Sequence, residues 1–210
     1  KINGRKRGSI KLTYNKEGKN SQALRAKLQT MGDRAPNLLI AGDSYSDITR
    51  GNNWIQLLQQ IIPLRCTGVA ANGNYDIWKS LKKETWDLLI VNLSHQQRLS
   101  RASISEGRPA HQQFFRDMLG LKIKKHEDLV LQFTKRIMSL QNAIFWSPFP
   151  FYESWDNVHS IILKTEDGMW SPILNAGPKE GYIGCHYTKL GNEIVCEKMC
   201  GWILDWLNKK

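Results

Sequence analysis

The chain has 210 residues, of which 41% are hydrophobic and eight are Trp, so it is long enough for one domain with a substantial core. This composition excludes a chain that is disordered throughout, and no apolar run reaches the roughly 18 residues that a membrane span needs. The formal net charge of +11 is unevenly placed, because residues 1–34 hold ten Lys or Arg against two acids, a net charge of +8.

Residues 1–35 are expected to form a basic N-terminal arm followed by a short helix. The arm predicts either an electrostatic contact with a polyanion, such as nucleic acid or a larger assembly like a virion, or a solvated extension without a partner. A helix is expected over 21–31, with Ser21 as its cap. No secretion signal is visible, but the chain begins at Lys1 rather than Met, so the sequence leaves the compartment open.

From residue 37 onward, short apolar runs alternate with amphipathic stretches. We expect strands at 37–41, 64–70, 87–93, 143–149 and 158–163, and helices at 52–62, 75–83, within 110–141 and at 188–207. This alternation predicts a three-layer α/β/α domain over residues 36–210, built on a parallel sheet of four or five strands.

The last helix is expected to face the core with one apolar stripe. Its members recur at helical spacing and are Leu190, Ile194, Val195, Met199, Trp202, Ile203 and Trp206. The aromatic stretch 145–152, which runs on from the fourth strand, is expected either to wall a pocket or to cap the core.

A serine follows the first strand directly, in Gly42-Asp43-Ser44. In an open parallel sheet, ligands bind beyond the carboxyl ends of the strands. A serine on a tight turn there has an exposed hydroxyl close to backbone N–H groups, as an acyl-transfer nucleophile requires. The same residues could instead cap a helix, so the tripeptide alone leaves both interpretations open.

The segment 39–44 resembles the first block of the SGNH, or GDSL, hydrolases, in which the nucleophilic serine follows the first strand. The catalytic His of that family precedes the last helix in a D-x-x-H-x-x-x-x-G stretch, and His186 and Gly191 occupy the corresponding positions here. The resemblance implies a flavodoxin-like sheet and a catalytic pair formed by Ser44 and His186. It covers about residues 36–207.

The resemblance also implies an oxyanion hole. Its donors would be the N–H of Ser44, the N–H of Gly73 after the second strand, and the side-chain amide of Gln96, which stands in the Asn register of the family's G-x-N-D block. Gly73 could alternatively be a plain turn between strand and helix.

The position of the family's triad acid, three residues before His186, holds Ile183. Three explanations stay open. Glu180 or Asp167 could swing in from the flanking loop, a backbone carbonyl could orient the imidazole in a Ser-His dyad, or the site could be degenerate. The nearby cysteines match no closed zinc motif, and the chemistry needs no metal or cofactor.

These observations predict a serine ester hydrolase. The resemblance implies small O-acyl esters, among them O-acetyl carbohydrates, as substrates. The alternative is a catalytically degenerate binding or assembly protein with the same fold, anchored by its basic arm to nucleic acid or to a larger particle.

Overall fold

A computed structural model describes residues 17–46, 53–67, 73–94, 126–148, 152, 154–163, 169–170 and 186–210. The side chains of Ser44, residues 126–130, residues 169–170 and His186 are outside this description. No helix within the described ranges is long and apolar enough to cross a membrane.

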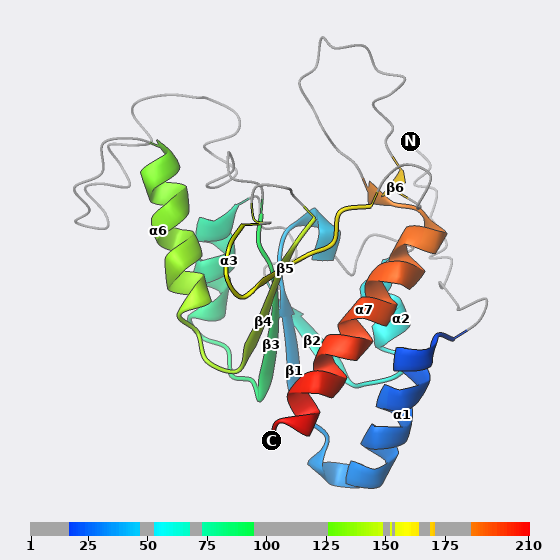
Figure 1. Cartoon of the computed structure of the whole chain (residues 1–210). Helices are drawn as coiled ribbons and strands as arrows, with labels where there is room; N and C mark the ends of the chain where they lie inside the picture. The colour runs from blue at the N-terminus through cyan, green and yellow to red at the C-terminus, as the bar shows by residue number, and fades with distance from the viewer. Residues whose placement is uncertain are drawn as a thin grey trace, which may run out of the picture.

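A five-stranded, fully parallel sheet forms the centre of the fold (Figure 1). Its strands are β1 (Leu38–Ala41), β2 (Leu64–Thr67), β3 (Leu88–Asn92), β4 (Ala143–Ser147) and β5 (Val158–Ser160). They lie in the order β2-β1-β3-β4-β5, which is the flavodoxin-like order. The predicted fold class is therefore confirmed. Residues 68–70, expected to continue β2, lie outside the described residues.

Helices cover both faces of the sheet (Figure 1). One face carries α1 (Lys19–Met31), α2 (Trp54–Leu58) and α7 (Lys189–Asn208), and the other carries α3 (Asn74–Leu81) and α6 (His126–Met138). The remaining elements are two 3₁₀ turns, η1 (Gly32–Arg34) and η2 (Ser44–Ser46), and a small antiparallel pair, β6 (Met169–Trp170) with β7 (His186–Tyr187).

The central strands are buried on both faces, which explains why they are continuous apolar runs in the sequence. In β1, Leu38 and Ile40 join the core under α1, α2 and α7, whereas Leu39 and Ala41 join the core under α3 and α6. All four side chains are at most 1% exposed. The alternation follows from the pleat, which points successive side chains to opposite faces.

The start of α1 is set by a residue of α7 and not by a local cap. The helix begins at Lys19, so the prediction that Ser21 caps it is wrong. The Glu197 carboxylate accepts hydrogen bonds from the backbone N–H of Asn20, from the N–H of Ser21 (3.1 Å) and from Ser21 Oγ (2.6 Å). Glu197 thereby satisfies N–H groups that the first turn of a helix leaves without partners.

Helix α1 also shares the core of the domain. Leu24 is fully buried and Leu28 nearly so, both in the cluster that includes residues of α2 and α7. This helix was expected to belong with the N-terminal arm in residues 1–35. In the structure, it packs along α7.

Helix α7 buries a face close to the one predicted. Val195, Met199 and Ile203 are fully buried, and Cys196 and Cys200 pack beside them. Leu190 is 53% exposed, so its place in the predicted stripe is wrong. It lies in the first turn of the helix, where the neighbouring Gly191 and Asn192 are buried, so the Leu190 side chain faces away from the core.

We expect Glu197→Ala to destabilise the protein by about 1–2 kcal/mol, the usual effect of losing a helix cap. The reason is that the N–H groups of Asn20 and Ser21 lose their acceptor. Urea unfolding would measure this change. Lys198→Ala, at the exposed neighbouring position of the same helix, is the control and should change stability by less than about 0.5 kcal/mol. Equal stabilities of the two variants would show that the carboxylate does not stabilise α1.

Candidate functional site

The strand order places Ser44 at the point where open parallel sheets bind ligands. Because β2 and β3 lie on opposite sides of β1, the chain direction across the sheet reverses there. The crevice outside the carboxyl ends of β1 and β3 is such a reversal point. The backbone of Ser44 begins η2 immediately beyond the end of β1, as the sequence predicted.

The serine turn is held by Asp43. The Asp43 side chain is fully buried, and its Oδ1 accepts the N–H of Tyr45 at 3.0 Å. The Asp43 carbonyl accepts the N–H of Ser46 at 2.9 Å. Neither bond uses the N–H of Ser44. Asp43, the residue before Ser44, thus holds the shape of the turn.

Gly42 is required by the close approach of two neighbouring side chains. A Cβ at this position would lie 2.7 Å from Asn92 Cβ and 2.8 Å from Ser46 Cβ, closer than two carbon atoms can pack. Asn92 ends β3, so the missing side chain lets the serine turn sit directly on the end of the neighbouring strand. This steric limit explains the Gly in the Gly-Asp-Ser sequence.

The segment that carries His186 lies against the serine turn. Tyr45 directly follows Ser44, and Tyr187 directly follows His186. The two tyrosine rings meet edge to face with their centroids 5.4 Å apart, and both side chains are buried. The two predicted catalytic residues therefore belong to segments in direct contact, although they are 142 positions apart in the sequence.

Asn192, in the first turns of α7, joins the same segments by hydrogen bonds. Its Oδ1 accepts the N–H of Trp54 at 2.9 Å, and its Nδ2 donates to the carbonyls of Tyr187 (3.2 Å) and Thr188 (3.0 Å). Trp54 Nε1 in turn donates to the carbonyl of Tyr45 at 2.8 Å. A continuous buried path thus links the serine turn, the start of α2 and the residue after His186.

Two buried tyrosines border this region. Burial raises the pKa of Tyr187 well above its ordinary value, and the nearby Tyr45 and the Asp43 carboxylate raise it further. Burial also raises the pKa of Tyr152; hydrogen bonds with Asn74 and Thr134 oppose this effect, and Asp43 adds to it. Both phenols therefore keep their protons at neutral pH.

Gly73 lies where the sequence predicted, between β2 and α3. It is buried, adopts an extended conformation and caps α3, and its carbonyl accepts the N–H of Ile77 at 3.2 Å. Gln96, Glu180 and Asp167 lie outside the described residues, as do the side chains of Ser44 and His186. The catalytic and oxyanion roles of these residues stay predictions.

Three polar residues near the site were missed by the sequence analysis: Asn74, Tyr152 and Asn192. All are at most 3% exposed and hydrogen bonded. Asn192 had a sequence signal, because it is a polar residue within a helix start that packs on the core. Tyr152 ends the aromatic stretch 145–152, of which Phe145, Trp146 and Tyr152 are buried in the core, in keeping with the interpretation as a cap.

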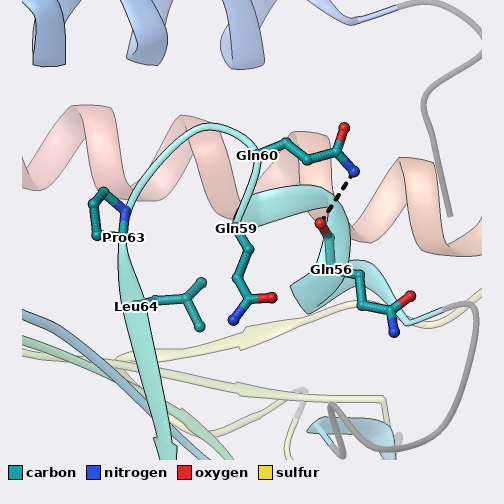
Figure 2. A pocket seen from close by; sticks show the side chains of 5 residues that line it. All are labelled: Gln56, Gln59, Gln60, Pro63 and Leu64. Atoms are coloured by element: carbon teal, nitrogen blue, oxygen red, sulfur yellow. Dashed lines mark hydrogen bonds between the residues drawn. The ribbon is translucent and has the colours of Figure 1, made fainter. Parts of the chain in front are cut away.

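A hollow of about 590 Å³ lies elsewhere, between the end of α2 and the start of β2 (Figure 2). It is lined by Gln56, Gln59, Gln60, Pro63 and Leu64. Gln60 is held by its own bonds, since its Nε2 donates to the Gln56 carbonyl (3.1 Å) and its carbonyl accepts from Arg25 (2.9 Å).

Comparisons with models of protein families, with curated proteins and with solved structures gave no match. Within the described ranges, no group of three or more His, Cys, Asp or Glu is placed to hold a metal ion.

Replacing Asn192 by Ala should destabilise the protein by about 2–3 kcal/mol, because the N–H of Trp54 and the carbonyl of Tyr187 would lose a buried partner. The free energy of unfolding in urea measures this. Asn208→Ala, at the exposed end of the same helix, is the matched control and should have little effect. A loss no larger than that of the control would mean that Asn192 does not hold the two segments together.

The protein should also lose stability as the pH rises above about 10, the pKa of tyrosine in an unfolded chain. The raised pKa of Tyr187 means that the folded state holds its proton where the unfolded state releases it, so ionisation favours unfolding. Tyr187→Phe should lose less stability between about pH 9 and 11 than the wild type in urea titrations. Identical pH dependence in both proteins would contradict this.

Proposed function

We propose that the protein is a serine ester hydrolase in which Ser44 is the nucleophile and His186 is the general base. The observation that carries the proposal is the contact between Tyr45 and Tyr187, which sets the Ser44 segment against the His186 segment. The contact lies at the reversal point of the sheet, the place where open parallel sheets bind ligands.

The reaction would proceed in two steps. Ser44 Oγ attacks the acyl carbonyl while His186 takes its proton, and His186 then gives that proton to the leaving alcohol. Water, deprotonated by His186, next attacks the acyl-serine, which releases the carboxylic acid and restores the Ser44 hydroxyl. Each step passes through a tetrahedral oxyanion that needs hydrogen-bond donors.

The donors would be the backbone N–H groups of Ser44 and Gly73, with the Gln96 amide as a third. The Ser44 N–H is supported by its place in the turn just beyond β1, where Asp43 accepts hydrogen bonds from the N–H groups of Tyr45 and Ser46 and so holds the turn in shape. Gly73 is supported by its place at the start of α3, because the N-terminus of a helix favours negative charge.

The imidazole of His186 also needs an orienting group, because Ile183 replaces the acid of the SGNH family. Glu180, Asp167 or a backbone carbonyl would supply it in the proposed site. Loss of the acid in a serine protease lowers turnover by about 10⁴, so a dyad would be a slow catalyst unless one of these groups compensates.

The substrate class that we propose is a small O-acyl ester, including O-acetyl groups on carbohydrates. It derives from the resemblance to the SGNH hydrolases at Gly42-Asp43-Ser44 and His186.

The second candidate function is that of a non-catalytic binding or assembly protein. One observation favours it, the net charge of +8 in residues 1–34.

Ser44→Ala should abolish both the hydrolysis of p-nitrophenyl acetate and the labelling of the protein by a fluorophosphonate probe, because the probe reacts only with an activated serine. His186→Gln should lower both rates by at least about 100-fold, the lower range for losing a general base. Mass spectrometry of the labelled protein should locate the phosphonyl group on Ser44.

Two variants serve as controls. Ser139→Ala removes an exposed serine after α6, and His159→Gln removes a histidine that stacks on Trp202. Both should retain wild-type rates. If the wild-type protein is not labelled, the hydrolase proposal fails and the non-catalytic function is supported. A non-catalytic binding protein should show salt-dependent retention on nucleic acid, and that retention should be lost when residues 1–16 are removed.

A further inference from the structure

Three polar side chains meet the backbone of Ser94 in a buried network beside Gly73. The side chains belong to Asn74 at the start of α3, Thr134 in α6 and Tyr152 after β4; Ser94 lies just after β3, and all four residues are at most 1% exposed. Asn74 is the centre. Its Oδ1 accepts the N–H of Ser94 at 2.9 Å, and its Nδ2 donates to Thr134 Oγ1 (2.7 Å) and to Tyr152 Oη (3.1 Å).

The network holds both backbone polar groups of Ser94. Its N–H donates to Asn74, and its carbonyl accepts the Tyr152 hydroxyl at 2.9 Å. Tyr152 therefore accepts from Asn74 and donates to Ser94, which closes a ring of three hydrogen bonds. Ser94 can shift relative to α3 only by breaking buried bonds, each of which is expensive to leave unmade.

The strand on the other side fixes the same segment. The N–H of Leu93 donates to the carbonyl of Trp146 at 2.8 Å, and Ser147 Oγ donates to the carbonyl of Leu93 at 3.2 Å. The end of β3 is thus anchored to β4, and the Asn74 network anchors the start of α3 to the end of β3. The position of Gly73, next to Asn74, follows from this chain of contacts.

We infer that Asn74 and Tyr152 are positioning residues that hold the Gly73 N–H at the reaction centre, because their hydrogen bonds fix the start of α3 to the end of β3. This inference rests on the proposed hydrolase function. Neither side chain needs to touch the substrate. They act by keeping the Gly73 N–H at a fixed distance from the serine turn. That turn packs against the end of β3, where Gly42 contacts Asn92.

Such a role makes a distinctive kinetic prediction. The oxyanion exists only in the transition state and the tetrahedral intermediate, so a misplaced donor lowers kcat and leaves KM nearly unchanged. Loss of an entire oxyanion donor costs about 10²- to 10³-fold in kcat. Misplacement by loss of one supporting hydroxyl should cost less, about 10-fold.

The test uses Tyr152→Phe, which removes the hydroxyl but keeps the ring that fills the core. Thr134→Val removes the hydroxyl that bonds with the Asn74 amide and with Tyr152, but it leaves the bonds of Asn74 and Tyr152 to Ser94 in place. Ile203→Val, in the buried face of α7, is the control for a mild loss of stability far from the network. The full chain is assayed for kcat and KM with p-nitrophenyl acetate and for the rate of fluorophosphonate labelling.

We expect Tyr152→Phe to lower kcat and the labelling rate about 10-fold, with KM within about twofold of the wild-type value. The kcat of Thr134→Val should lie between those of Tyr152→Phe and the wild type. Ile203→Val should have the wild-type kcat. If the wild type is active and Tyr152→Phe has the same kcat as Ile203→Val, the positioning role of Tyr152 is overturned. The proposed hydrolase function is not affected by that result. A wild type without turnover that depends on Ser44 would overturn the proposed function and, with it, this inference.

Discussion

The buried amide of Asn192 is the constraint on which the candidate site depends. Its oxygen and nitrogen contact the start of α2 on one side and the end of β7 on the other. Buried polar groups are costly to leave unpaired, so these segments have one favourable arrangement. That arrangement sets Tyr187 against Tyr45, and with them the positions in the chain that hold His186 and Ser44.

Most of the fold could be predicted because it depends on local patterns. The strands are apolar runs, since both faces of the sheet are covered, and α7 shows its buried face at helical spacing. The predictions were wrong where tertiary contacts, and not local patterns, determine the structure. The start of α1 is set by Glu197, 177 positions from Asn20, and Leu190 is exposed although its neighbours Gly191 and Asn192 are buried, because its side chain faces away from the core.

In the candidate site, too, the features that depend on local motifs could be predicted and those that depend on tertiary contacts could not. The places of Ser44, Gly73 and His186 follow from short motifs next to strands and helices, and the structure puts their backbones at the ends of the expected elements. The long-range hydrogen bonds that hold these motifs together could not be predicted. Asn74 meets Thr134 and Tyr152 across 60 and 78 positions, and Asn192 meets Trp54 across 138. Nothing in one sequence identifies such pairs of polar side chains.

The central claim is that Ser44 and His186 act as one catalytic pair. The most direct measurement is the distance between Ser44 Oγ and the nearer ring nitrogen of His186 in a crystal structure that shows both side chains. The account predicts a direct hydrogen bond or a contact through one water molecule. Two ordered side chains that are too far apart for even a bridging water would contradict it.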